Sequence, residues 1–229
     1  MNKILVFICF LLLLNTSLSA QKYEPVAVRA GTKVIDYFPP RERYRYPEFV
    51  SGRVQFKNGI YSDTRLNYNF LMGEMEFIKS GDTLSIINKK DIRYVVVAQD
   101  TFFYDKGYLE LISGGPVRVA LKQYIKLKEV LKKDSYGTSS SGSATNSYGS
   151  LPVDGSFYKL AANEDMVFQK TLEYYLTTSS SGFVQFSKKN VIQLFPQKGD
   201  AIKAYLKSNK VDFDSRDDLI RLAYYLGSL

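Results

Sequence analysis

The chain of 229 residues contains no histidine, and its single cysteine is Cys9. Without histidine, the Ser-His-Asp and Cys-His catalytic arrangements are excluded, because each needs an imidazole base. Zinc, copper and haem sites of the usual kind also depend on His or Cys ligands. Neither glycine-rich phosphate loop, G-x-x-x-x-G-K-S/T or G-x-G-x-x-G, occurs in the chain. We therefore expect no metal ion and no cofactor.

Long hydrophobic runs are also scarce, and the longest extends from Ile4 to Leu14. Lys3 precedes this run and small or polar residues follow it up to Ala20, which is the pattern of a secretory signal peptide. We expect residues 1–20 to be this peptide, cut after Ala20 or alternatively one residue earlier. The run is too short for a membrane-spanning helix, and no second run reaches that length. The sequence thus predicts an exported chain in the periplasm, at the periphery of the outer membrane or outside the cell.

Acidic residues are in the minority, with 23 Asp and Glu against 31 Lys and Arg, and the formal net charge is +8. A basic exported protein attracts acidic partners through its overall field. We therefore expect an envelope protein, an anionic glycan or a lipid head group as the partner. Nucleic acid would suit the same charge, but export argues against it.

Residues 50–133 have the pattern of an antiparallel β-meander. Val54 and Phe56 alternate with polar neighbours, which is the period of a half-buried strand. Asn58-Gly59 follows and predicts a hairpin, because both residues tolerate positive φ. Short turns between the later strands imply antiparallel neighbours. The run Ile92–Val97 hardly alternates, so we expect it at the centre of the sheet.

The flanking segments are expected to attach to this sheet. Residues 21–49 contain several prolines and predict an extended N-terminal arm, whereas the Ser- and Gly-rich residues 134–155 predict a flexible linker. Residues 156–229 predict a C-terminal region with short strands and three short helices. Ser187 and Ser215 are expected to cap the first and last helix, and the last helix has an apolar stripe of Leu219, Leu222, Ala223 and Leu226. The expected fold class is α+β, with an antiparallel β-meander or rolled sheet followed by a small strand-plus-helix C-terminal region.

The strongest candidate binding surface is one face of the last strand of the meander. Period-two alternation places the following residues on that face: Arg118, Lys122, Tyr124, Lys126 and Lys128. Such a group of cations predicts an anion-binding surface. The alternative is structural, because lysines on an edge strand protect it against aggregation.

A second candidate lies in the N-terminal arm. If this arm is extended, Arg41, Arg43 and Arg45 align on one side, with Tyr44 and Tyr46 beside them. The functional interpretation is a strip that binds anions. The structural interpretation is a solvated arm whose tyrosines pack on the sheet.

Carboxylates are the remaining candidates for catalysis. Glu74 and Glu76 share one face of a strand, which suits a glycoside hydrolase or a Ca²⁺ site, but their alternation with Met75 and Phe77 predicts a solvent-facing pair. Ser156 and Lys159 have the S-x-x-K spacing of penicillin-recognising enzymes without the companion motifs. Four aspartates, Asp212, Asp214, Asp217 and Asp218, resemble a Ca²⁺ cluster without the spacing of an EF-hand.

The motifs Leu66-Asn-Tyr-Asn69, Gly73-Glu-Met-Glu-Phe77 and Gly81-Asp-Thr-Leu84 resemble a recurrent pattern in uncharacterised exported β-rich proteins of Bacteroidota. The tail from Lys189 to the final helix is similar to theirs as well. This resemblance covers most of the mature chain and implies an envelope location, but no assigned activity and no catalytic residues.

These observations together predict an exported, non-enzymatic binding or assembly protein of the cell envelope, with a basic surface for an acidic partner. The alternatives are a polysaccharide-acting enzyme that uses carboxylates such as Glu74 and Glu76, or a purely structural envelope subunit.

Overall fold

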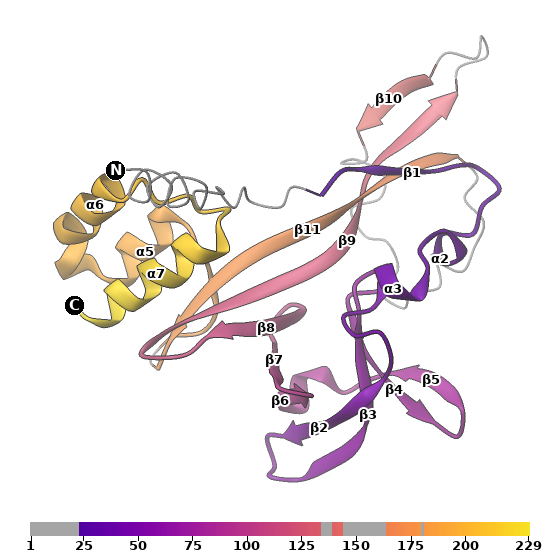
Figure 1. The fold of residues 1–229 in the computed structure, drawn as a ribbon, viewed down its shortest axis with the longest axis horizontal. Helices are drawn as coiled ribbons and strands as arrows, with labels where there is room; N and C mark the ends of the chain where they lie inside the picture. The colour runs from indigo at the N-terminus through magenta and orange to yellow at the C-terminus, as the bar shows by residue number, and fades with distance from the viewer. Residues whose placement is uncertain (1–22, 134–138, 144–163, 180) are drawn as a thin grey trace, which may run out of the picture.

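A computed structural model of the chain describes residues 23–133, 139–143, 164–179 and 181–229 (Figure 1). The expected signal peptide and the Ser156–Lys159 motif lie outside these residues. The first half of the described chain contains β1 (Val26–Val28), α2 (Val34–Tyr37), α3 (Pro40–Arg43), β2 (Val50–Phe56), β3 (Tyr61–Asn69), β4 (Glu74–Lys79), β5 (Asp82–Ser85), the short 3₁₀ helix η1 (Lys89–Asp91), β6 (Ile92–Val97), β7 (Asp100–Tyr104) and β8 (Tyr108–Ser113). The second half contains β9 (Val117–Lys133), β10 (Ser139–Ser143), β11 (Asp165–Thr178), β12 (Val184–Gln185), α5 (Lys188–Leu194), the 3₁₀ helix η3 (Pro196–Lys198), α6 (Gly199–Ser208) and α7 (Arg216–Gly227).

The strands form one 12-stranded sheet in the order β1-β11-β9-β8-β7-β6-β2-β3-β4-β5, with β10 paired to β9 and β12 paired to β11. All of these strand pairs are antiparallel. Within the described residues the sheet is not closed, and the helices are few. The expected β-rich α+β class is therefore confirmed at this level.

Two hairpins form where the turn residues predicted them. Gly59 has a φ of +90°, and the Asn58-Gly59 turn joins β2 to β3. Lys106 and Gly107, with φ of +53° and +125°, join β7 to β8. Glycine makes such left-handed turns accessible because it has no Cβ atom.

The expectation of a simple meander is wrong after β5. β6 does not pair with β5 but returns to β2, where Val54 faces Val95. β6 therefore lies between β2 and β7, which confirms the central position predicted for Ile92–Val97. A short turn predicts that the two strands it joins are paired. The connection between β5 and β6 is longer and contains η1, so the chain can return to pair with β2.

The C-terminal region shares the sheet through a long strand. β11 has 14 residues and pairs with β9 from Val117 to Leu131, so the prediction of only short strands in this region is wrong. The expected linker at 134–155 contains strand β10, which pairs with residues 129–133 of β9; the rest of the linker lies outside the described residues. Ladder bonds come from the backbone, so a Ser- and Gly-rich composition does not prevent pairing.

The N-terminal arm is not extended throughout, contrary to expectation. Residues of β1 pair with β11, and α2 and α3 follow (Figure 1). Pro40 occupies the first turn of α3, where its fixed φ suits a helix and its missing N–H costs no hydrogen bond. Pro40, one of the prolines that suggested extension, therefore starts a helical turn instead.

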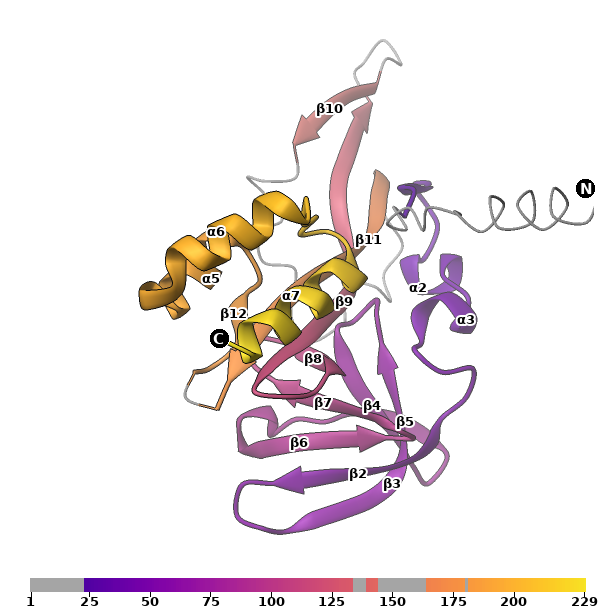
Figure 2. The same ribbon diagram turned by 60° about the vertical axis from the view of Figure 1, so that its left-hand side comes forward.

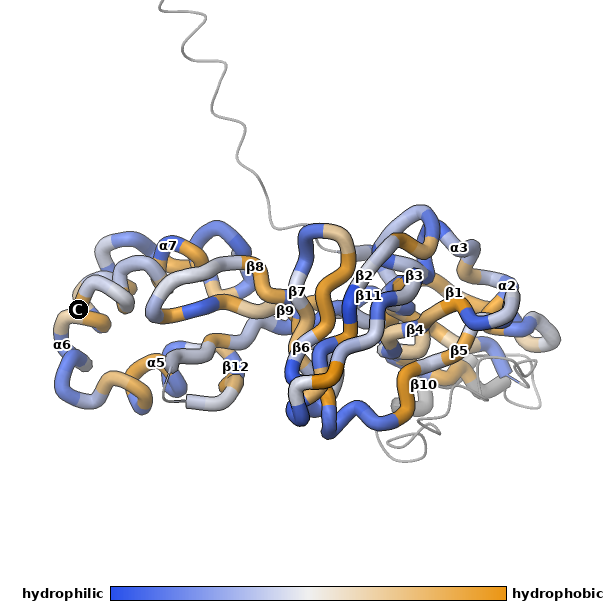
Figure 3. The backbone as a smooth tube through the Cα atoms, turned by 90° about the horizontal axis from the view of Figure 1, so that it is seen from below, coloured by the Kyte–Doolittle hydropathy of each residue, from blue (hydrophilic) through white to orange (hydrophobic). Residues whose placement is uncertain are grey.

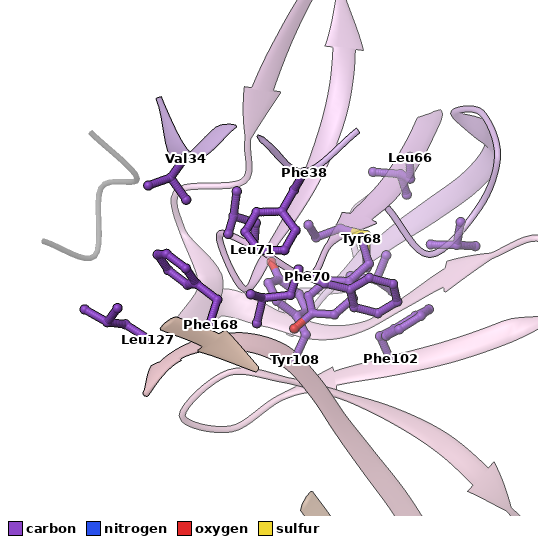
Figure 4. Close-up of a cluster of buried hydrophobic side chains, with 14 of the residues drawn as sticks. Val34, Phe38, Leu66, Tyr68, Phe70, Leu71, Phe102, Tyr108, Leu127 and Phe168 are labelled. Carbon is purple, nitrogen blue, oxygen red and sulfur yellow. The ribbon is translucent and has the colours of Figure 1, made fainter. Parts of the chain in front are cut away.

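The described residues enclose two hydrophobic cores. The first core lies against β2–β4, β6 and the middle of β9, and Figure 4 shows Tyr68, Phe70, Phe102 and Tyr108 gathered within it. The ring centroid of Tyr68 is 5.5–5.9 Å from those of the other three. The second core lies between the start of β9, the end of β11 and helices α5–α7, and α7 crosses in front of the two strands in Figure 2.

The three C-terminal helices form as predicted. Ser187 Oγ accepts a hydrogen bond from Asn190 N, and Ser215 Oγ accepts one from Asp218 N. The predicted stripe of α7 is buried, with Leu219 and Leu222 fully inaccessible to solvent. Figure 3 shows α5–α7 at one end of the molecule and β4–β5 with α2–α3 at the other. None of the helices in the described part of the chain is long and apolar enough to cross a membrane.

Candidate functional site

The candidate site is the outward face of β9, which we call the basic strip and define by Arg118, Lys122, Tyr124, Lys126 and Lys128. β11 pairs with one edge of β9 along its length, whereas on the other edge β8 pairs only with residues 119–121 and β10 only with residues 129–133, so residues 122–128 have no strand partner on that edge in the described structure. Lys122, Tyr124, Lys126 and Lys128 fall in this segment, so protection of an exposed edge stays the structural alternative for the three lysines.

Two members of the basic strip are held by neighbouring groups. Lys122 Nζ donates to the carbonyl oxygen of Lys106 at 3.0 Å and lies 5.2 Å from the ring centroid of Tyr124. Tyr124 Oη donates to Glu173 Oε1 at 2.6 Å, and Tyr175 Oη donates to the other oxygen of Glu173 at 3.0 Å. Burial and the adjacent carboxylate of Glu173 raise the pKa of Tyr124, so its hydroxyl stays protonated. These contacts fix the geometry of the middle of the strip.

Lys126 and Lys128 are the accessible cations of the strip. Both are exposed, and neither has an ion pair with any residue that the structure describes. Gln169 of β11 lies opposite Lys126, so the neighbouring strand provides no countercharge there. Lys128 lies at the bulge where the register between β9 and β11 shifts. Arg118 is half-buried opposite Thr177.

The three arginines of the arm do not form one strip, contrary to expectation. Arg41 is exposed on α3 and lies 3.8 Å from Glu42 Oε1. Arg43 has a buried Nε without a hydrogen-bond acceptor in the described structure. Arg45 points to the sheet and donates to both oxygens of Glu110 at 3.0 Å. The turn of helix α3 separates the side chains that an extended arm would have aligned.

Arg45 is the centre of a network that sequence reasoning did not find. Asp100 Oδ2 accepts from Arg45 Nη2 at 3.2 Å and from Tyr46 Oη at 2.7 Å. The hydrogen bonds to Glu110 raise the pKa of Arg45, so it is a permanent cation whose charge is already neutralised. Glu110 is 7% exposed, and its position in the apolar run Tyr108–Ile112 is the sequence signal for a buried acid with a basic partner.

The carboxylates Glu74 and Glu76 are buried, at 7% and 5% exposure, so the expectation that they face solvent is wrong. The arm covers them: Tyr44 bridges to Asn69, and Tyr44 Oη donates to Glu76 Oε2 at 2.8 Å. Glu76 Oε1 accepts from Asn69 Nδ2 at 3.2 Å. Period-two alternation was correct, but it could not show that a second layer covers this face.

Glu74 forms an ion pair with Lys89 through Oε1, while its buried Oε2 has no hydrogen-bond partner in the described structure. Burial raises the pKa of Glu74, and Lys89 opposes this shift only in part. Both carboxylates of β4 are thus enclosed within protein contacts instead of facing a cleft.

The aspartates near α7 serve local structure. Asp212 Oδ1 accepts from Asp214 N at 2.9 Å, and Asp218 Oδ2 accepts from Asp212 N at 2.8 Å. Within the described ranges, no group of three or more His, Cys, Asp or Glu side chains is placed to hold a metal ion.

A comparison of the chain with protein-family models, with curated proteins and with solved structures finds no match.

Proposed function

We propose that this chain is an exported, non-enzymatic binding or assembly protein of the cell envelope, which holds an acidic partner on the basic strip of β9. The partner class is an envelope protein, an anionic glycan or a lipid head group. The observation that supports the proposal most directly is the exposure of Lys126 and Lys128 without acidic residues opposite them on β11. The resemblance to exported proteins of Bacteroidota and the pattern of residues 1–20 motivate the envelope location.

The charges of Lys126 and Lys128 remain available to a partner. A solvated ammonium group attracts anions over about a Debye length, roughly 8–10 Å at physiological salt. Tyr124 and Lys122 are fixed beside them by their contacts with Glu173 and Lys106, so the middle of the strip is rigid. A rigid surface loses little conformational entropy when a partner binds. The burial of Glu74 and Glu76 gives the alternative of a polysaccharide-acting enzyme no open cleft at these residues.

The test is binding of the purified mature chain to three probes: vesicles that contain phosphatidylglycerol, immobilised heparin as a polyanionic glycan, and crosslinked envelopes from the native host. The variant is Lys126→Gln with Lys128→Gln. Because each lysine near an anionic surface contributes on the order of 1 kcal/mol, the double variant should bind about thirtyfold more weakly. Binding should also fall steeply as salt increases.

The matched control is Lys203→Gln with Lys207→Gln, which removes the same charge from α6. This control should bind nearly as well as the wild-type chain. Equal binding by a folded Lys126→Gln, Lys128→Gln variant to all three probes would contradict the proposal and favour a purely structural subunit.

A further inference from the structure

A groove of about 780 Å³ lies in the concave angle between the β2–β3 and β4–β5 hairpins. Figure 1 shows these hairpins pointing apart from the place where β3 meets β4. Apolar side chains form most of the lining, chiefly Val54, Phe56, Leu66, Phe77, Leu84 and Ile86. The groove continues the first core, because Val54 and Leu66 belong to its buried cluster and Phe56, Phe77 and Ile86 pack against it.

Large apolar side chains are exposed at the rim of this groove. Among the described residues there are seven exposed large hydrophobic side chains; Leu84 and Ile87 line the groove, and Ile60 is paired with the lining residue Phe56. Ile87 is 84% exposed and Ile60 is 63% exposed. Scattered exposed hydrophobic residues are normal, but a group of them around an apolar groove is typical of an interaction site.

The two strands that flank the groove have open edges. β3 pairs with β2 from Tyr61 to Leu66, but it pairs with β4 only from Leu66 to Asn69. After Leu66 and Phe77 the two strands separate, and β4 continues to Lys79 with β5 as its partner. Residues 61–65 of β3 therefore have a strand on one edge only within the described structure.

The register shows which backbone groups face this opening. Phe56 N donates to Ile60 O, so the even residues of β3 exchange hydrogen bonds with β2. The N–H and C=O groups of Asp63 and Arg65 then point to the other edge, toward the groove. The Leu66–Phe77 pair is flanked by Arg65 and Ile78, so the C=O of Arg65 and the N–H of Ile78 face each other and are not open. Asp63 and Ile78 are both part of the groove lining.

The charge at the groove is also asymmetric. Asp63 is engaged by Arg53, which donates to its two oxygens at 2.7 and 2.9 Å. Lys79 also lines the groove, and it has no ion pair with any residue that the structure describes. A carboxylate on the occupant would complement Lys79.

We infer that the groove binds a single extended peptide segment of a partner protein, which adds as a strand to the open edge of β3. Alternate apolar side chains of this segment enter the groove, and an acidic residue or a carboxyl terminus meets Lys79. Strand addition pairs the open backbone groups, which are the N–H and C=O of Asp63 and the N–H of Arg65, and it also covers the apolar lining. An acyl chain would fill the groove but leave those groups unpaired. The edge of another sheet would not fit, because β4–β5 flanks the opening on its far side.

The site does not depend on the basic strip, which lies on β9. The test begins with a randomised peptide library displayed on phage and selected against the mature chain. The selected peptides should show alternating apolar residues and a recurrent acidic position. Hydrogen exchange with the best synthetic peptide should then protect the amides of Asp63 and Arg65. The amides of Ser62 and Thr64, which already face β2, should not change.

Two variants locate the binding. Ser62→Trp places a large side chain in the groove and should weaken peptide binding by about tenfold or more. Its matched control is Ser51→Trp, because Ser51 is also an exposed strand serine but faces the other side of the sheet. Asp63→Pro removes one edge N–H, whereas Asp63→Asn retains it, so only the proline variant should lose affinity.

Three results would overturn the inference. The library could yield no peptide whose binding falls in Ser62→Trp. A selected peptide could bind without protecting the amides of Asp63 and Arg65. Palmitate could bind in the groove while no selected peptide protects those amides, which would assign the groove to an acyl chain.

Discussion

The two ends of the molecule bury their sheet faces in different ways. At one end, helices α5–α7 cover β9 and β11 with aliphatic and aromatic side chains such as Leu219, Leu222 and Leu226. At the other end, the N-terminal arm covers β3 and β4 with a polar layer. There Asn67, Asn69, Glu74 and Glu76 are all buried.

This difference explains what the sequence could reveal about each end. A helix that covers an apolar sheet face must have apolar residues on one side, so its sequence shows a stripe at helical spacing. The N-terminal arm is instead held on β3 and β4 by hydrogen bonds, and the strand residues beneath it are polar, like those of a face exposed to solvent. Buried polar residues are therefore invisible to alternation alone, although they fix the position of the arm.

The largest effect is expected at the apolar end. Leu222→Ala removes a fully buried side chain from α7 and should lower the free energy of unfolding by about 3 kcal/mol, through lost transfer energy and a residual cavity. Urea denaturation with an unchanged slope measures this loss. Tyr224→Ala on the same helix is the control, because Tyr224 is 64% exposed and should change stability by about 0.5 kcal/mol or less. Equal effects of the two substitutions would refute the proposed role of α7 as an apolar cover.

An intermediate effect is expected under the arm. Asn67 accepts from Tyr46 N at 3.1 Å and donates to the carbonyl oxygens of Tyr46 and Glu48 at 2.9 and 3.1 Å. Asn67→Ala leaves those backbone groups unpaired and should cost about 2 kcal/mol. Denaturation measures the loss, and faster proteolysis in the arm should accompany it. Asn88→Ala, at an exposed position, serves as the control. A neutral Asn67→Ala would mean that the polar layer does not hold the arm.

The smallest effect concerns the pH dependence of stability. Burial raises the pKa of Glu74 in the folded state, so the ionised carboxylate is unfavourable there and the protonated form is not. The ionised Glu74 therefore lowers the free energy of unfolding. This loss of stability is absent below the ordinary carboxyl pKa of 4.5 and appears as the pH rises from there through the raised pKa.

Glu74→Gln cannot ionise, so its stability relative to the wild-type chain should increase as the pH rises through this window. Denaturation at several pH values measures the difference. The control is Glu48→Gln, at an exposed side chain, which should show no such trend. A difference that stays constant with pH would show that Lys89 compensates fully for the burial of Glu74.

Local signals predicted local structure well. Asn58-Gly59 formed its hairpin, Ser187 and Ser215 capped their helices, and Ile92–Val97 became a central strand. The candidate basic residues of β9 share one face, as their spacing indicated, and Lys126 and Lys128 are accessible.

The predictions that were wrong concern the arm that packs over the sheet and the strands that pair with one another. Alternation placed Glu74 and Glu76 on one face but could not reveal the arm above it, and proline suggested extension where Pro40 starts a helix. The return of β6 to β2 and the long pairing of β11 with β9 join segments distant in sequence. Such pairings depend on tertiary packing and leave no local periodic signal.

β9 takes part in both cores, with Val119 and Leu121 in the helical one and Ile125 and Leu127 in the other. Its partner β11 spans both cores in the same way, through Leu176 at one end and Phe168 at the other. Neither core can open without breaking the ladder that supports the other. The chain should therefore melt as one cooperative unit, with equal calorimetric and van't Hoff enthalpies, although its helices and its open groove lie at different ends.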